Sequence, residues 1–293
     1  GVGSATDGLY FAMKALGLDH NSTIACPVIS YSATRDAITR LGATIKYIDV
    51  DSIGNIGSLD GAEVDAVVYV NLYGNPADYD RLNKFCDDRG IPLIEDAAQS
   101  QGAMYGKIPS GAMGDVSVFS FDPMKNMPSF GGGGMVLTDS KEIRDTIVSL
   151  RRHGISGKDK YGYNSLISED HANQLLLLLK KFDRLQAMRE KVCRRYMKNI
   201  PEVQILCEGP NTKSSHHKLV ILNDRRDDLK AYLETKGIQT KIHYLKTLDA
   251  EHLGQYPNAE KICAKALSLP MYPHLKMKEV DYICDRIKEF IHV

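Results

Sequence analysis

The sequence has no excess of either charge, no long apolar run and no internal repeat. Lysine and arginine total 37, and aspartate and glutamate also total 37, so no overall field favours nucleic acid or an anionic membrane as a partner. No apolar stretch reaches the roughly 18 residues of a membrane span, and no charged-then-apolar leader opens the chain. Nothing in the sequence predicts export, and any anionic ligand must be bound by local donors.

The six cysteines show no CxxC spacing. Scattered thiols are typical of reduced cysteines in a cytoplasmic protein, whereas disulfide frameworks and zinc sites need paired spacings. We therefore expect a cytoplasmic location, no disulfides and no metal site. The cysteines are Cys26, Cys86, Cys193, Cys207, Cys263 and Cys284.

The first half of the chain alternates apolar runs with helical patterns. Residues 66–70 are apolar without alternation, as expected of a strand that is covered on both faces. This pattern predicts a three-layer α/β domain with a mostly parallel sheet. The expected strands are 24–27, 44–50, 66–73, 91–98, 116–121 and 135–138, with helices such as 33–41 and 80–88 between them.

The second half predicts a smaller α+β domain, and 293 residues with 43% apolar content are enough for both cores. We expect a large domain at 1–165, a long connecting helix within 166–200 and a small domain at 201–293. The start inside a motif, without methionine, suggests that the large domain is N-terminally incomplete. The expected elements are helices at 140–152, 170–199, 226–236, 259–267 and 278–291, and strands at 217–222 and 238–244.

Lys125 is a candidate amine nucleophile. Residues 116–121 are typical of a buried strand, and Pro123 ends it, so Lys125 emerges in a loop at the strand's end. The glycine run 131–134 allows a tight turn or a close approach to a ligand. By itself, a surface lysine is the commoner interpretation.

Asp96 gives the lysine a partner. The apolar run 91–94 leads into Glu95-Asp96-Ala97-Ala98-Gln99, and parallel strands point their carboxyl ends at one crevice. Pyridoxal phosphate needs a lysine that holds it as a Schiff base and an acid that keeps its pyridine nitrogen protonated. Without Lys125, we would interpret Asp96 as a residue that caps the next turn.

The first nine residues predict a phosphate cradle. Small residues, a hydroxyl and free amides at the start of a helix bind phosphate well. Gly1 and Gly3 also match half of a dinucleotide fingerprint, but Thr6 replaces its third glycine and no strand precedes it.

Tyr31 follows the first predicted strand and has two interpretations. Its ring can lie flat against an aromatic cofactor, or it can pack in the core, and the residues alone favour neither. This choice stays open at the level of sequence.

With these residues in place, the chain resembles the DegT/StrS-type nucleotide-sugar aminotransferases, which are pyridoxal-phosphate enzymes of the aspartate aminotransferase fold. The match runs nearly end to end, and the order and spacing of its motifs make it specific. The motifs are GSATDGL at 3–9, LYGNP at 72–76, EDAAQ at 95–99, FSF at 119–121 with Lys125-Asn126, GYN at 162–164, His243-Tyr244 and LSLPMYP at 267–273.

The resemblance implies a role for each matching residue. Lys125 resembles the lysine that holds the cofactor, and Asp96 resembles the acid at its pyridine nitrogen. Tyr31 lies where the family stacks an aromatic ring, and Gln99 where it places a donor near the phenolic oxygen. The other matches are Ala5, Thr6 and Ser120 as phosphate ligands, Asn164 as a phosphate ligand across a dimer interface, and His243 and Tyr244 at the sugar end.

The same resemblance implies the reaction and the assembly. An amino acid, which we expect to be glutamate, gives its amino group to the cofactor, and pyridoxamine phosphate then aminates a keto-sugar nucleotide. Such reactions serve the biosynthesis of amino sugars and of polysaccharides or cell-surface glycans. A homodimer with shared active sites is expected, with no nucleic-acid or membrane partner.

Three departures from the family pattern concern the substrate. Gly132 replaces a usual acidic or amide residue, Leu166 a common arginine, and Asp249 a frequent histidine. The family's N-terminal helix is also absent from this sequence. These differences leave the cofactor residues intact and put the identity of the sugar in doubt.

Two other functions stay open. One is another pyridoxal-phosphate reaction on the same fold, such as elimination or dehydration, since a fold does not fix a reaction. Relatives that dehydrate have histidine in place of Lys125, which disfavours that branch. The other is a non-catalytic regulatory homologue, which the intact Lys125 and Asp96 disfavour.

Overall fold

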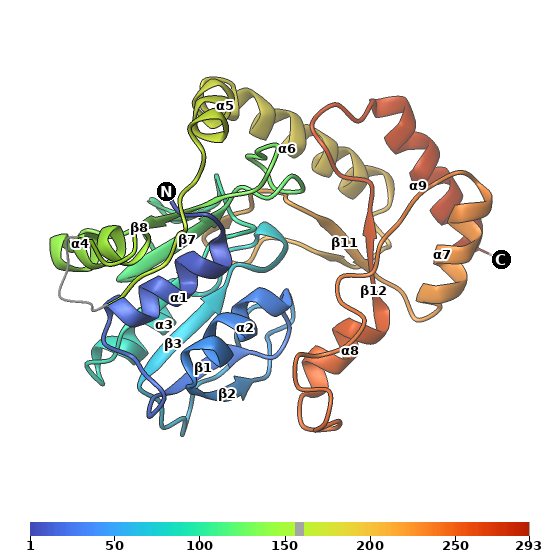
Figure 1. Cartoon of the computed structure of the whole chain (residues 1–293). Coiled ribbons are helices and arrows are strands. Elements are labelled where there is room, and N and C mark those ends of the chain that lie inside the picture. Colours follow the sequence, from blue (N-terminus) through green and yellow to red (C-terminus); the bar gives the residue numbers. More distant parts are fainter. Residues whose placement is uncertain (156–160, 293) are drawn as a thin grey trace.

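The computed structural model describes residues 1–155 and 161–292, and a six-stranded sheet forms its larger part (Figure 1). Its order is β2-β1-β3-β4-β7-β8, with neighbours parallel except for the antiparallel pair β7 and β8. The predicted mostly parallel sheet is confirmed. Its strands are β1 Thr23–Pro27, β2 Thr44–Ile48, β3 Ala66–Val70, β4 Leu93–Asp96, β7 Val116–Ser120 and β8 Gly134–Leu137.

Helices cover both faces of this sheet, which gives the predicted three layers. Ala66 and Val68 of β3 belong to the core cluster that includes residues of α1, α2 and α4, whereas Val67 and Tyr69 pack in the cluster that includes α3. Because successive side chains of a strand point to opposite faces, a strand apolar throughout is buried on both. The helices are α1 Ala5–Ala15, α2 Ser32–Leu41, α3 Tyr79–Asp87 and α4 Lys141–Leu150.

A smaller antiparallel sheet lies in the C-terminal part of the chain, with order β12-β11-β9. Helices α6, α7 and α9 pack with β11 and β12 in one apolar cluster, and α8 joins a cluster with residues near the ends of β1 and β3. The elements are β9 Ile205–Leu206, β11 Leu219–Leu222, β12 Ala266–Leu269, α7 Arg226–Thr235, α8 Pro257–Lys265 and α9 Met277–Ile291.

The long connecting helix predicted within 166–200 is wrong in one respect. Two helices occupy this segment, α5 Glu169–Leu179 and α6 Phe182–Asn199, and Lys180 and Lys181 separate them. The leucine run at the end of α5 is apolar on every side, so the helical period gives no sign of the break, and no proline or glycine marks it.

Two C-terminal predictions are also wrong. Residues 238–244 form no strand and contribute only the isolated bridge between Lys241 and Ser268. The helix predicted at 259–267 ends at Lys265, and the next residues form β12, which pairs with β11 across some fifty residues of sequence. Such long-range pairing overrides local pattern.

Short strands connect the two parts of the molecule. β5 Met104–Tyr105 pairs with both β6 Ile108–Pro109 and β10 Thr212–Lys213. The strand expected at 66–73 ends at Val70, and the 3-10 turn η1 Leu72–Gly74 follows it. The segment from β10 to β11 therefore lies against loops of the large sheet.

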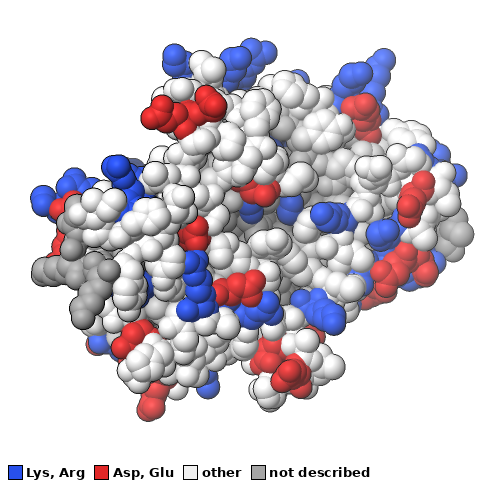
Figure 2. Space-filling view, viewed as in Figure 1, with Lys and Arg blue, Asp and Glu red and all other residues white. Residues whose placement is uncertain are grey.

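Both signs of charge are spread over the molecular face shown in Figure 2, without an extended patch of one sign. In the ranges 1–155 and 161–292, no helix is long and apolar enough to cross a membrane. Residues 156–160 and 293, which fall within the predicted segments 1–165 and 201–293, lie outside the described residues.

Candidate active site

A cavity of about 710 Å³ lies at the carboxyl ends of β1, β4 and β7. A second cavity, of about 570 Å³ beside β8, contains none of the predicted site residues. The first brings together all of them except Asn164, from segments spread over the whole chain. They are Ala5, Thr6, Tyr31, Asp96, Gln99, Ser120, Lys125, His243 and Tyr244.

Asp96 is the last residue of β4 and is only 4% exposed. Its Oδ2 accepts a hydrogen bond from the Thr34 hydroxyl at 2.8 Å, and its Oδ1 accepts one from the Ala98 N–H at 3.1 Å. Burial raises the pKa of Asp96, while these donors and the positive charge of Lys125 lower it. The carboxylate is thus held in place and buried, and a further cation beside it would stabilise its charge.

Lys125 lines the same cavity, so the interpretation as an ordinary surface lysine is wrong. Its loop is closed by the Lys125 N–H, which donates to the Asp122 carbonyl at 2.9 Å, and by the Phe121 N–H, which donates to the Gly133 carbonyl at 2.9 Å. Burial lowers the pKa of the Lys125 amine, and the attraction of Asp96 and Asp122 opposes this. A lowered pKa makes the neutral amine, which is the nucleophile and base, more accessible near neutrality.

The start of α1 supplies backbone donors to the cavity. Ser4 caps the helix and accepts from the Asp7 N–H at 3.1 Å, whereas the amides of Ala5 and Thr6 lie in the first turn, where a helix has no carbonyl to receive them. A side chain at Gly134 would lie 2.7 Å from the Ala5 nitrogen, so this approach requires glycine. Together with the Ser120 hydroxyl, these groups give the cavity donors of the kind that bind an anion.

Tyr31 does not pack in the core. It is 61% exposed, caps α2 from the end of the β1 segment and lines the cavity. Core packing is therefore excluded for Tyr31, and its ring is free to contact a ligand.

Gln99 is buried and bridges two tyrosines. Its Oε1 accepts from the Tyr73 N–H at 3.0 Å, and its Nε2 donates to the Tyr244 hydroxyl at 3.3 Å. The side chain is thereby held at the cavity with its amide group oriented.

His243 and Tyr244 reach the cavity from the loop after Lys241. The His243 Nδ1 lies 2.8 Å from the Ser268 hydroxyl, and the Tyr73 hydroxyl donates to the His243 carbonyl. Burial, followed by the charges of nearby lysines, lowers the pKa of His243 to about 3. Its imidazole is therefore neutral at physiological pH.

Asn164 is exposed and lies outside the cavity. It forms an isolated bridge with Arg152, and the neighbouring Ser165 hydroxyl accepts from the Gly3 N–H at 3.0 Å. Asn164 therefore does not line the cavity of its own subunit, and its predicted role as a phosphate ligand depends on the cavity of a partner subunit.

Several cavity residues escaped the sequence prediction, and four of them are polar side chains that matter for the chemistry of the site. Thr34 holds Asp96, and its place in the first turn after Tyr31 was the available signal. The others belong to the C-terminal part, and no local pattern sets them apart from other charged loop residues. They are His217, Lys218 and Lys241.

These residues fit pyridoxal phosphate. The buried Asp96 carboxylate lacks a cation that a protonated pyridine nitrogen would supply, the α1 amides suit a phosphate, and the Lys125 amine suits an aldehyde. The three features surround one cavity whose volume lies in the range of small-molecule sites.

Comparison with known proteins agrees with this assignment. The sequence profile of the DegT/DnrJ/EryC1/StrS aminotransferase family matches residues 1–288. A pleiotropic regulatory protein of Geobacillus stearothermophilus is 32% identical, over 99% of this chain and 84% of the relative. The dTDP-3-amino-3,4,6-trideoxy-alpha-D-glucose transaminase of Streptomyces venezuelae is 31% identical, over 99% of this chain and 82% of the relative.

A solved structure gives the same answer for the fold. The crystal structure of S. venezuelae DesV in complex with a ketimine intermediate has a TM-score of 0.94 and 29% identity, and the similarity covers 100% of this chain and 84% of that one. The predicted aminotransferase fold is confirmed. The chain belongs to the DegT/DnrJ/EryC1/StrS aminotransferase family, which uses pyridoxal phosphate.

Proposed function

We propose that this chain is an aminotransferase that moves an amino group from an amino acid, with glutamate as the donor, to the keto group of a sugar nucleotide. The observation that carries the proposal is the meeting of Lys125 and the buried Asp96 in one cavity beside the α1 amides. The Streptomyces relative, named as a transaminase of a dTDP-linked sugar, supports this substrate class. The product class would be amino sugars for glycans or related polysaccharides.

Bound pyridoxal phosphate carries the amino group and withdraws electrons from the carbon attached to it. Asp96 Oδ1 and Oδ2 provide the negative charge that holds a proton on the pyridine nitrogen, and Thr34 fixes their orientation. The Lys125 Nζ, with its lowered pKa, would take the proton from the substrate carbon. It would then deliver this proton to the carbon of the cofactor's aldehyde group.

The remaining cavity residues bind and orient. Ala5, Thr6 and Ser120 hold the phosphate through the α1 amides and the hydroxyl, and the exposed ring of Tyr31 covers the cofactor. In its neutral form, His243 hydrogen-bonds the sugar without adding charge, and Tyr244, fixed by Gln99, lies beside it.

Absorbance of the holoenzyme tests the proposal. Addition of glutamate should bleach the band of bound pyridoxal phosphate, and a keto-sugar nucleotide should restore it.

The Geobacillus relative is named as a regulatory protein, which favours regulation as a second candidate function. A scaffold without catalysis would bind the cofactor with no such exchange, and an eliminating enzyme would release ammonia without forming an amino sugar.

Shared active sites in a homodimer are part of the proposal. Asn164 is exposed and lies next to Ser165, which contacts the start of the chain. Two large apolar side chains are also uncovered, Phe130 (86% exposed) in the glycine-rich loop and Leu177 (64% exposed) on α5. Exposed apolar side chains of this size are typical of an interface. Asn164 would then reach the cofactor phosphate of the partner subunit.

Subunit mixing tests the shared site. A dimer of one Lys125→Ala subunit and one Asn164→Asp subunit contains one site with both lesions and one with neither, so activity should partly return. Mixed dimers that form without any return of activity would exclude the shared site.

The absence of CxxC pairs and the six free cysteines support a cytoplasmic location.

A further inference from the structure

The cavity contains more positive charge than the assigned roles use. Among the described residues that line it are the two aspartates Asp96 and Asp122 and the three lysines Lys125, Lys218 and Lys241. Within residues 1–155 and 161–292, neither Lys218 nor Lys241 forms an ion pair, in contrast to Lys213 and Lys265 of the same part of the chain. Both amines therefore lack an anionic partner.

Lys218 is fixed at the edge of the cavity by its backbone. Its N–H donates to the Tyr73 carbonyl at 3.1 Å, and β11 begins with the next residue. Three residues earlier, the Ser215 N–H donates to the Gly74 carbonyl at 2.9 Å, and the Ser215 carbonyl accepts from Asn126 Nδ2 at 2.9 Å. Lys218 therefore cannot leave the site without breaking contacts to the loops that carry the cofactor residues.

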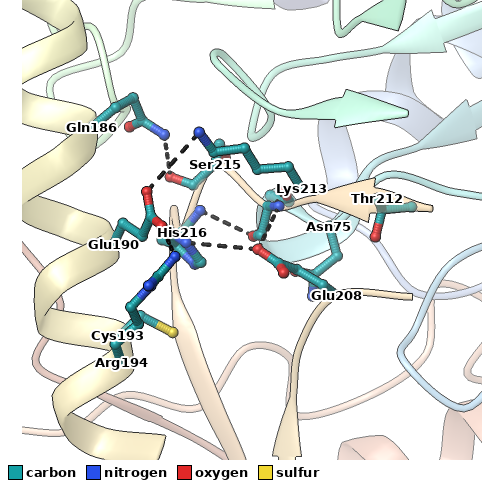
Figure 3. A network of polar contacts seen from close by, with 12 residues as sticks. Asn75, Gln186, Glu190, Cys193, Arg194, Glu208, Thr212, Lys213, Ser215 and His216 are labelled. Atoms are coloured by element: carbon teal, nitrogen blue, oxygen red, sulfur yellow. Dashed lines mark hydrogen bonds and ion pairs between the residues drawn. The ribbon is translucent and has the colours of Figure 1, made fainter. Parts of the chain in front are cut away.

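A polar network holds the same segment against α6 (Figure 3). Gln186 donates to the Ser215 carbonyl at 2.9 Å, Glu190 lies 3.9 Å from Lys213, and Glu208 lies 3.7 Å from His216. None of these contacts involves the amine of Lys218. The network supports the backbone of Lys218 and leaves its charge unpaired.

The surroundings of Lys218 disfavour its own charge. Burial, followed by the charges of Lys125, Lys241 and Arg189, lowers the pKa of Lys218 to about 8, and the charge of Asp122 opposes this. A half-buried cation among cations gains most from an anionic ligand, because the ligand supplies the charge that the protein omits.

The position beside Lys125 indicates which anion this is. Asn126, the residue after Lys125, contacts the segment that carries Lys218: its Nδ2 donates to the Ser215 carbonyl at 2.9 Å, and its Oδ1 lies 3.2 Å from His217 Nδ1. Lys125 and Lys218 therefore line the same part of the cavity. In an amino acid, the carboxylate is bonded to the carbon from which Lys125 would take a proton. In a sugar nucleotide, the diphosphate is attached at the anomeric carbon, and no charged group is bonded directly to the keto carbon.

We propose that Lys218 binds the carboxylate of the amino donor next to the reacting carbon. This inference rests on the proposed function and makes Lys218 a specificity residue of the first half-reaction. The keto carbon of the sugar has no carboxylate bonded to it, so the second half-reaction would not need Lys218. One cavity would thus accept two unlike substrates by using different cations for each.

Titration of the holoenzyme with 2-oxoglutarate tests this role. This probe has the carboxylates of glutamate but no amino group, so it binds to the pyridoxal form without turnover. Lys218→Met removes the charge and keeps the apolar stem, and it should raise the Kd for 2-oxoglutarate about 10- to 100-fold. Lys218→Arg keeps the charge and should restore most of the affinity. Lys84→Met, on α3 with a side chain 77% exposed, is the matched control and should bind as wild type does.

Two further titrations separate the sources of the anion. The Kd for pyrophosphate and the Kd for pyridoxal phosphate should both stay within about twofold of wild type in Lys218→Met. If the affinity for pyrophosphate or for the cofactor falls instead, Lys218 binds a phosphate group and the proposal is wrong. If the methionine variant folds poorly, Lys218→Gln takes its place, since it removes the charge and keeps a polar side chain, and an unchanged Kd for 2-oxoglutarate in that variant would overturn the proposal.

The proposed function and this inference fail differently. A wild-type holoenzyme that exchanges no amino group with any amino acid would overturn both. A wild-type enzyme that is bleached by glutamate, together with a Lys218→Met variant that binds 2-oxoglutarate unchanged, would overturn only the role of Lys218.

Discussion

Thr34→Val isolates the part of catalysis that depends on the orientation of Asp96. The Thr34 hydroxyl donates to Asp96 Oδ2 at 2.8 Å and lies 2.9 Å from the Ser30 hydroxyl, and all three groups are buried. Valine has the same shape without the donor. A hydrogen bond to a charged group contributes about 1.5–3 kcal/mol, so the first half-reaction should slow about 10- to 100-fold.

The same change should move the acid limb of the pH profile. The Thr34 donor lowers the pKa of Asp96, so its loss raises that pKa further. Because the ionised carboxylate is the active form, activity is lost as pH falls through the pKa, and this loss should begin at a higher pH in Thr34→Val.

Stopped-flow absorbance with glutamate measures both effects. Thr34→Ser keeps the hydroxyl and serves as the control, with an unchanged acid limb. A Thr34→Val enzyme whose rate stays within about twofold of wild type, with the same acid limb, would refute the idea that Thr34 supports Asp96.

Further predictions concern the two central residues and the C-terminal core. Lys125→Ala should retain no borohydride-stable link between cofactor and protein, whereas a link found by peptide mapping at another lysine would show that the site is assigned wrongly. Asp96→Asn should bind the cofactor and lose turnover, because an amide provides no negative charge, and near wild-type turnover would exclude the proposed role. The glutamate half-reaction should speed up as pH rises through the lowered pKa of Lys125, because the neutral amine is the base, and a pH-independent rate would contradict this. Tyr196→Phe should lower the free energy of unfolding in urea by about 0.5–1.5 kcal/mol, because the buried hydroxyl donates to the Pro270 carbonyl at 3.0 Å. Tyr282 is the control, because this residue is 45% exposed and its hydroxyl donates to the Lys236 carbonyl. Tyr282→Phe should lower the free energy of unfolding less than Tyr196→Phe does, and equal losses would refute the burial argument.

The site residues of the large sheet could be predicted because the sheet is parallel. Asp96 follows an apolar run, and Lys125 follows another, so the rule that strand carboxyl ends converge brings both to one cavity. Local sequence was enough here, since each strand carries its own signal in its apolar run.

The C-terminal contributions could not be predicted in the same way. Lys218 approaches the cavity because the segment from β10 to β11 packs on the turn after β3, and Lys241 because its backbone bridges to Ser268 of β12. Residues far apart in sequence decide both contacts. Likewise, β12 forms by pairing with β11, and its four residues lack the β-branched side chains that mark a strand.

Tyr31 shows a different limit. Stacking and core packing both use an aromatic ring after a strand, so residue type cannot separate them. Exposure of 61% at the cavity decides against the core.

Transfer of labelled nitrogen tests the central claim most directly. The holoenzyme would be incubated with 15N-glutamate and a panel of keto-sugar nucleotides, and the products analysed by mass spectrometry. We expect one member of the panel to acquire a single 15N amino group, with Lys125→Ala inactive under the same conditions. Release of 15N as ammonia, or label in no sugar while the cofactor is bound, would contradict the account.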